Sequence, residues 1–268
     1  MKYLFNTIKI SIIIAALLSC SVLMAQDDEF ENYAFDDNET QKNPYFALSF
    51  GGNFHFLFMD YNEINKKFSD CDCYDALKFS GPITGWGFNF FTAMSPLVNN
   101  ARIGISYFSG SQEKEFTTIL IGPISSMNIN YNRKLSVSNK GIHFDYAFVP
   151  VKSLAMLPGL GLKLGNMTLE QYATNISQHW NEEFLVATGG NKLEYSYIAI
   201  EPQISIEYAI TGFLMLRAAG SYVLPFDNPF SSNVWTINGN NQYSGVPNSV
   251  KPQGFSASIG LYLGLFNY

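Results

Sequence analysis

The chain has 268 residues, of which 47% are hydrophobic and only 14% are charged. That charged fraction is low for a soluble protein, and a formal net charge of −6 offers no basic surface of the kind that binds nucleic acid. Three cysteines are too few for a framework of disulfides. The composition therefore argues against a nucleic-acid-binding domain and against a small disulfide-rich scaffold.

The first segment of the chain predicts export. Two lysines precede an apolar run from Ile10 to Ala25, and a glutamine and two aspartates follow it. This order is typical of a secretory signal peptide, so we expect residues 1–25 to be removed by cleavage after Ala25. A second interpretation takes Leu17–Cys20 as a loose lipobox, in which Cys20 is lipidated and becomes the mature N-terminus.

An acidic stretch follows the signal peptide. Residues 26–44 hold seven acids against one lysine and have no apolar periodicity, which predicts a disordered lead-in in the periplasm. No later stretch reaches the roughly 18 to 20 consecutive apolar residues that a membrane-spanning helix needs.

The clearest pattern in the chain is a hairpin between Tyr197 and Leu224. In both arms large apolar residues alternate with small or polar ones, and a short turn at Thr211–Phe213 joins the arms. An arm of about ten residues with one wholly apolar face is typical of a transmembrane β-strand. With a three-residue turn, the antiparallel register places Glu207 opposite Arg217 on the polar face.

The same alternation recurs from Tyr45 to the last residue and predicts eight strands. The connections between them are alternately long (59–81, 109–140, 166–193 and 227–252) and short (95–100, 150–153 and 211–213). An even-stranded outer-membrane barrel has long loops outside the cell and short turns in the periplasm. We therefore predict an all-β, antiparallel, up-and-down transmembrane barrel over residues 45–268, with four long extracellular loops and both mature termini in the periplasm. Residues 109–140 leave two alternatives open: Phe116 to Ile121 and Met127 to Leu135 could extend the third and fourth strands beyond the membrane, or they could form a further hairpin, which would give ten strands.

The polar face of the strands decides which side meets lipid. A soluble sandwich or lipocalin would turn its apolar side inward and expose the other face to water. Here that other face is rich in glycine and carries scattered charges, which suits the lumen of a narrow barrel, where small residues make room for long polar ones. Backbone groups in hydrocarbon must all be paired, and for strands this requires a closed barrel.

The last predicted strand, Phe255 to Tyr268, has aromatic residues at Tyr262, Phe266 and Tyr268. This ending resembles the signal that the barrel-assembly machinery reads. Together with the export signal and the strand order, it makes the chain similar to small bacterial outer-membrane barrels of the OmpA/OmpX transmembrane type. Two glycines stand where that pattern usually has large apolar residues, and the leucines of the opposite parity make the better lipid face. The expected partners are outer-membrane lipid and the assembly machinery, and no surface ligand can be read from the sequence.

Several polar residues are predicted to point into the lumen. They are Asn53, His55, Asn89, Arg102, His143, Asp145, Lys163, Glu201, Gln203, Glu207 and Arg217. One interpretation is a selective pore or a catalytic cluster. The other, which we favour, is a hydrogen-bonded ionic core that fills an eight-stranded barrel too narrow for a channel.

Two further motifs carry potential chemistry. His143 and Asp145 share one strand face, but no serine or cysteine nucleophile accompanies them at a spacing that the sequence fixes, so we predict no catalytic residues. Cys71 and Cys73 lie among carboxylates in a predicted loop. They are too few for a typical four-ligand metal site, and we expect a disulfide or free thiols rather than a metal.

These observations predict a non-enzymatic outer-membrane barrel without a cofactor, which anchors surface loops for envelope structure or binding. A narrow diffusion channel for small solutes is the alternative. An outer-membrane lipid-modifying enzyme is less favoured than either.

Overall fold

The computed structural model describes residues 45–66, 74–94, 97–121, 126–175, 187–229, 235–239, 241–242 and 244–267. The predicted signal peptide, the acidic lead-in and Cys20 lie outside the described residues. The same holds for Cys71, Cys73 and Tyr268. What the sequence predicts for these parts of the chain stays a prediction.

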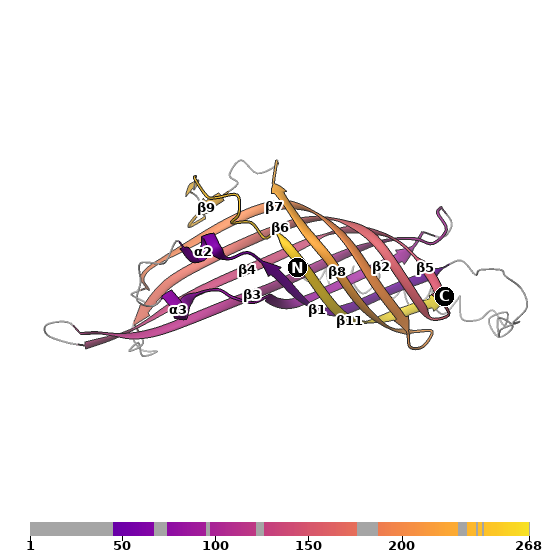
Figure 1. The fold of residues 1–268 in the computed structure, drawn as a ribbon, viewed down its shortest axis with the longest axis horizontal. Helices are drawn as coiled ribbons and strands as arrows, with labels where there is room; N and C mark the ends of the chain where they lie inside the picture. Colours follow the sequence, from indigo (N-terminus) through magenta and orange to yellow (C-terminus); the bar gives the residue numbers. More distant parts are fainter. Residues whose placement is uncertain are drawn as a thin grey trace, which may run out of the picture. The chain divides into compact units, whose positions relative to one another are not determined.

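Eight long strands form a closed antiparallel barrel (Figure 1). They are β1 (Phe46–Met59), β2 (Ile83–Ala93), β3 (Ala101–Ile121), β4 (Ser126–Tyr146), β6 (Leu154–Asn175), β7 (Ala187–Ala209), β8 (Leu214–Asp227) and β11 (Gly254–Asn267). Each barrel strand pairs with the next one along the chain, and β11 returns to β1, where Phe46 lies opposite Asn267. The predicted eight-stranded up-and-down barrel is confirmed. The described residues of 109–140 extend β3 and β4 and do not form a further hairpin.

The remaining elements are short. They are the strands β5 (Phe148–Val151), β9 (Trp235–Ile237) and β10 (Asn241–Gln242) and the helices α2 (Asn62–Lys66) and α3 (Tyr74–Leu77). Within the described ranges, no helix is both long enough and apolar enough to cross a membrane.

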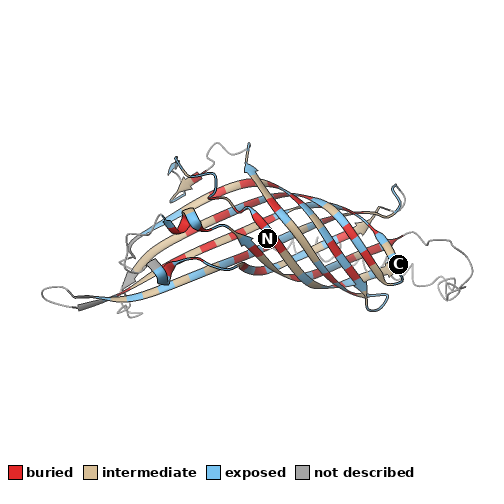
Figure 2. Cartoon of the chain, in the orientation of Figure 1, coloured by how far each residue is buried: buried red, intermediate tan, exposed pale blue. Residues whose placement is uncertain are grey.

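The two faces of the barrel wall differ as the alternation predicts. Figure 2 shows buried and exposed residues alternating along each strand. The outward face, which we call the apolar belt, exposes 70% of Trp86 and 63% of Leu263, and the inward face buries Arg102 completely. The belt includes Phe46, Phe50, Phe58, Trp86, Phe88, Phe90, Ile105, Ile142, Phe144, Leu160, Leu162, Leu164, Ile200, Ile204, Ile206, Leu216, Phe226, Phe255, Ile259, Leu261, Leu263 and Leu265.

Short turns join the strands at one end of the barrel, which we call the turn end. Asn100 and Ser153 take the left-handed backbone conformation, with φ of 63° and 67°, that tight turns often require. In the third turn the Ile210 N–H donates to the Leu214 carbonyl at 2.9 Å, and the Leu214 N–H donates to the Thr211 hydroxyl at 3.0 Å. These positions match the predicted short connections.

At the opposite end, the loop end, four strands run on past the barrel (Figure 1). β3, β4, β6 and β7 stay paired well beyond the apolar belt, so the predicted loops 109–140 and 166–193 are largely strand. For 109–140 this is the strand extension that the sequence allowed, and for 166–193 it corrects the predicted loop. The alternation continues in these segments with inverted chemistry, because serines and charged residues face outward while Leu135, Val137, Met167 and Leu169 face inward and are buried. The inversion is expected where the outer face meets water.

A second hydrophobic core covers the inward face of this four-stranded extension. Tyr61 and Ile64 from the first loop, Phe79, and Trp235 from β9 pack against the inward residues of β4, β6 and β7. Arg133 is buried at the centre and donates from Nη1 to the Leu77 carbonyl at 2.9 Å. Its Nη2 donates to a second carbonyl, in α2, and its guanidinium lies 4.8 Å from the Phe79 ring. The first loop is thereby tied to the sheet.

Candidate functional site

The structure places every residue of the predicted luminal set on an inward-facing position of its strand. Most are buried, among them Asn53, His143, Asp145, Lys163 and Glu201. The small residues between them leave space in the barrel wall, as the sequence suggested. Gly104 lies against the His143 ring and Gly165 against the Tyr197 ring, and a Cβ on either glycine would overlap that ring.

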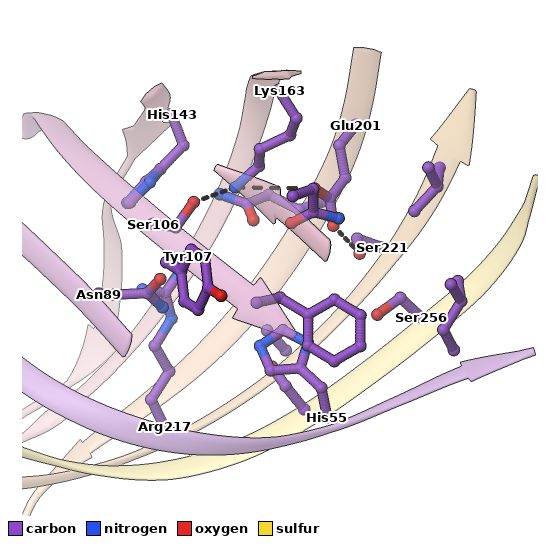
Figure 3. Close-up of a pocket in the computed structure, with 17 residues that line it drawn as sticks. His55, Asn89, Ser106, Tyr107, His143, Lys163, Glu201, Arg217, Ser221 and Ser256 are labelled. Carbon is purple, nitrogen blue, oxygen red and sulfur yellow. Dashed lines mark hydrogen bonds and ion pairs between the residues drawn. The ribbon is translucent and has the colours of Figure 1, made fainter. Parts of the chain in front are cut away.

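A polar chamber occupies the middle of the lumen (Figure 3). Its volume is about 40 Å³, enough for a few water molecules. Lys163 donates to the Ser106 hydroxyl and lies 3.7 Å from the Glu201 carboxylate, to which Ser221 donates at 2.5 Å. The chamber is therefore lined by the ion pair of Lys163 and Glu201, from β6 and β7, and by serine hydroxyls from β3 and β8.

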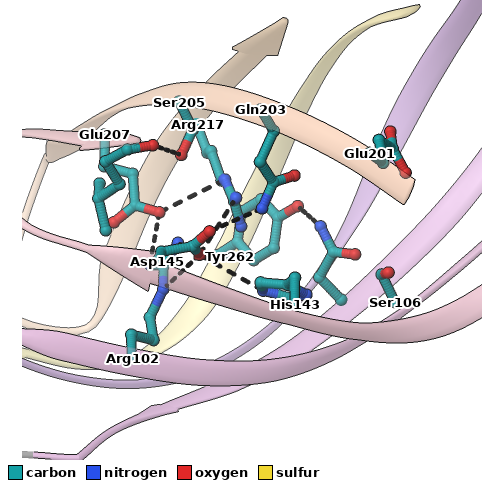
Figure 4. A network of polar contacts seen from close by, with 12 residues as sticks. Arg102, Ser106, His143, Asp145, Glu201, Gln203, Ser205, Glu207, Arg217 and Tyr262 are labelled. Atoms are coloured by element: carbon teal, nitrogen blue, oxygen red, sulfur yellow. Dashed lines mark hydrogen bonds and ion pairs between the residues drawn. The ribbon is translucent and has the colours of Figure 1, made fainter. Parts of the chain in front are cut away.

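Below the chamber, towards the turn end, five residues that are linked by ion pairs and hydrogen bonds fill the lumen; Figure 4 shows Arg102, Asp145, Glu207 and Arg217. We call them the ionic plug: Tyr45, Arg102, Asp145, Glu207 and Arg217. Arg102 Nη2 donates to Asp145 Oδ2 at 2.6 Å, and Arg102 Nη1 donates to Glu207 Oε1 at 2.7 Å. Tyr45 donates its hydroxyl to the same Glu207 carboxylate at 3.1 Å. Arg102, Asp145 and Glu207 have fully buried side chains, so these ion pairs lie in a region without bulk water.

The predicted pair of Glu207 and Arg217 exists as part of this larger network. The two residues are cross-strand partners, as the turn length required, and Arg217 Nε lies 3.4 Å from Glu207 Oε1. Arg102 binds the same carboxylate oxygen more closely, from the other side of the barrel. Arg217 Nη1 has no hydrogen-bond partner among the described residues, and because Arg217 lines the chamber, water there is its expected partner.

His143 lies at the edge of the plug, beside Asp145. His143 Nε2 is 3.5 Å from Asp145 Oδ2, so the two predicted neighbours do meet. The Asp145 carboxylate, however, already accepts hydrogen bonds from Arg102 and from Gln203, at 2.7 Å. The hydroxyl of Ser106, which also lines the chamber, is bound by Lys163. The geometry is that of a structural network.

The lumen is apolar on both sides of this polar middle. At the turn end, Ala47, Phe91, Leu157 and Met215 are fully buried in one cluster. Phe91 also supports the plug, because its ring centre lies 3.9 Å from the Arg102 guanidinium carbon, a cation–π distance. At the loop end, the core of the extension lies above the chamber.

Sequence reasoning missed several members of this site. Tyr45 precedes the first strand, and Phe91 lies on a strand face that carries no charged residue. Neither was therefore predicted as a luminal contact. Tyr262 was assigned to the assembly signal, but its side chain is buried in the lumen and accepts hydrogen bonds from Asn53 and Asn89, both at 2.9 Å. The leucines of β11 face outward, as their alternation in the sequence suggested, and this parity turns Tyr262 inward. Recognition of this strand by the assembly machinery stays a prediction.

A smaller polar cluster lies at the loop end, outside the apolar belt. Tyr195 stacks on Trp235 with ring centres 4.5 Å apart and donates its hydroxyl to Asp227 at 3.0 Å. Burial, together with this bond to a carboxylate, raises the pKa of Tyr195. Lys251 donates to Asp227 at 2.9 Å and lowers the pKa of that carboxyl group. Trp235 and Tyr195 thus pack the loops together.

One glycine offers a direct test of the plug. A Cβ on Gly159 would overlap the Asp145 carboxylate and lie 2.7 Å from the Phe144 carbonyl oxygen. Gly159→Ala should therefore displace the Asp145 carboxylate and lower the free energy of unfolding by about 1–3 kcal/mol. The matched control is Gly220→Ala in β8, where a Cβ would make an ordinary contact of 3.5 Å with Phe255. Urea unfolding in detergent measures both variants. Equal stability of the two would contradict this account of Gly159.

Comparisons with known proteins find only distant similarity. No family model matches the chain, and the search of curated proteins finds no significant match. Among solved structures, the chain is similar to a major outer membrane protein of Thermus thermophilus, with 8% identity, 82% of this chain and 100% of that chain covered, and a TM-score of 0.48. It is also similar to Ail, the attachment invasion locus protein of Yersinia pestis, with 9% identity, coverage of 84% and 99%, and a TM-score of 0.37. CarO2 of Acinetobacter baumannii gives 7% identity, coverage of 83% and 100%, and a TM-score of 0.37. Likeness at these identities concerns the fold alone.

Proposed function

We propose that this chain is a closed, non-conducting β-barrel of the bacterial outer membrane, which carries a folded extension outside the cell for envelope structure or binding. The observation that carries the proposal is the ionic plug. Arg102, Asp145 and Glu207 are fully buried and bound to one another across the lumen. A solute path along the axis would have to break these pairs, and breaking a buried pair is costly.

The membrane location is supported by the outer surface. Large apolar side chains cover the outward face of all eight strands, and the closed ring leaves no unpaired sheet edge at that level. In this orientation the turn end lies in the periplasm. The four-stranded extension then stands outside the cell, where its own hydrophobic core holds the first loop in place.

A narrow diffusion channel is the second candidate, and the polar chamber is the observation in its favour. Lys163, Glu201 and the hydroxyls around them could line part of a water path. That path would need the plug to rearrange at one end and the extension to open at the other. A lipid-modifying enzyme has the weakest support, because Asp145 is already engaged by two donors beside His143.

Two measurements test the proposal. The protein should appear in the outer-membrane fraction and should migrate differently on a gel before and after boiling, as folded barrels do. In planar lipid bilayers the purified barrel should give no steady conductance. A soluble periplasmic protein without a mobility shift would contradict the membrane location. A well-resolved, steady channel would favour the second candidate over the first.

A further inference from the structure

At β3 and β4 the apolar belt ends closer to the turn end than on the neighbouring strands, and we call this notch in its loop-end border the polar step. On β3 the last large outward residue below the loop end is Tyr107, and the exposed serines Ser109 and Ser111 follow it. On β4 the outward face changes after Ile142, and the next outward residue is the exposed Lys140. Both strands continue beyond this level as paired strands. The change is therefore one of side-chain chemistry on an unbroken wall.

The neighbouring strands keep apolar residues at the same register. Lys140 pairs with Leu164 of β6, Leu164 pairs with Ile198 of β7, and Ile198 pairs with Phe226 of β8. Barrel strands are tilted, so such a row is not level across the wall. Tyr107, the partner of Lys140 on β3, is nearer to the turn end of its strand than Leu164 or Ile198 is to that of its own. The tilt therefore makes the step deeper than the register alone indicates.

The residues around the step indicate where it lies relative to a membrane. Lys140 pairs with Tyr107, whose ring stacks on Phe88 at 5.3 Å, and Ser109 pairs with Trp86. Exposed tryptophan and tyrosine rings are typical of the boundary between hydrocarbon and headgroups. The step thus lies at headgroup level. Among the described residues Lys140 has no ion-pair partner. An exposed lysine in this position extends its ammonium group along the barrel surface towards the polar headgroup layer.

We propose that this polar step, formed by Ser109, Ser138 and Lys140, binds the phosphorylated sugar headgroup of a glycolipid in the outer leaflet. The inference rests on the proposed outer-membrane location and adds a specific lipid contact to it. The acyl chains of such a lipid would cover Ile142 and Leu164. Its headgroup would then lie directly above them, in contact with the step. There the Lys140 ammonium binds a phosphate, and the two serine hydroxyls face the sugar.

Charge complementarity favours this occupant over a second protein. Among the described residues the step offers one cation without an ion-pair partner, beside small hydroxyls, and its neighbouring rings, Trp86 and Tyr107, lie at the edge of the lipid-facing belt. A phosphate supplies the missing charge and sugar hydroxyls suit the serines. A lysine near a membrane surface contributes about a fivefold gain in affinity for an anionic lipid.

Native mass spectrometry of the folded barrel in uncharged detergent tests the proposal, with bisphosphorylated lipid A as the probe. Lys140→Gln should weaken lipid A binding about fivefold. The matched control is Lys152→Gln, which removes the same charge from a turn-end position and should leave binding unchanged. With dephosphorylated lipid A, wild type and Lys140→Gln should bind equally. Ser138→Leu, which fills the step with an apolar group, should also weaken binding.

Three results would overturn the proposal. The first is equal lipid A affinity of wild type and Lys140→Gln, and the second is an equal loss in Lys152→Gln. The third is the same Lys140-dependent affinity for phosphatidylglycerol, which would assign the contact to any anionic lipid. Gel mobility before and after boiling is measured on the same samples. If the shift is present and lipid binding does not depend on Lys140, the glycolipid contact is wrong while the barrel stands. If wild type shows no shift, the proposed function itself is wrong.

Discussion

An Arg102→Ala barrel is expected to unfold at a much lower urea concentration than wild type, with a loss of about 3–5 kcal/mol in the free energy of unfolding. The substitution removes the cation that holds Asp145 and Glu207 at 2.6 and 2.7 Å. Both carboxylates would then stay buried, and the remaining arginine, Arg217, lies further away, at 3.8 and 3.4 Å. Unfolding in detergent, followed by the change in gel mobility, measures the effect.

Two comparisons make this prediction specific. Arg217→Ala should also destabilise the barrel but less, because its distances to the carboxylates are longer and the Arg102 pairs remain. Replacing Arg102 and Asp145 together by apolar residues of similar volume should recover much of the loss, because the main penalty is an uncompensated buried charge and Glu207 then still faces Arg217. An Arg102→Ala barrel as stable as wild type would contradict the plug as a stabilising element.

The second large effect is expected at the loop end. Arg133→Ala removes two hydrogen bonds from a buried guanidinium to the carbonyls of Leu77 and Ile64. Hydrogen bonds that involve a charged group contribute about 1.5–3 kcal/mol each. The first loop should therefore open far more often, and trypsin should cleave it about a hundredfold faster, since cleavage follows the population of the open form.

The barrel itself should be unaffected by this change, because Arg133 lies beyond the apolar belt. Gel mobility before boiling should stay that of wild type. Glu63→Gln is the matched control, since it breaks only the exposed pair with Lys66 and should change the cleavage rate little. Wild-type rates of cleavage in Arg133→Ala would show that the loop is held by its apolar contacts alone.

The sequence predicts the barrel well because one rule applies along most of it. Apolar side chains alternate with small or polar ones, and a turn of known length then fixes the register, as for Glu207 and Arg217. The rule fails above the belt, where water replaces lipid and the faces exchange their chemistry. Leu135 and Val137 are inward and apolar there, so a search for outward apolar residues identifies these strands as loops.

The plug was predictable only as a set of residues. Alternation places Arg102 and Glu207 inside the barrel, but they are 105 residues apart and lie on strands that do not pair. Which cation binds which carboxylate depends on side-chain lengths across the lumen. The role of Tyr45 depends on the same three-dimensional fit, because its hydroxyl contacts Glu207, 162 positions away.

The return of β11 to β1 sets the order in which the molecule can be completed. Seven of the eight joints in the ring lie between consecutive barrel strands, so they can form as hairpins while the chain is being delivered. The eighth joins the two ends of the folded region, and Asn53 and Tyr262, which meet across it, are 209 residues apart. Contacts of such sequence separation form slowly. Until β11 pairs, β1 and β8 both present unpaired strand edges, so a chain truncated shortly before Gly254 would leave an open sheet with two such edges and no closed lumen.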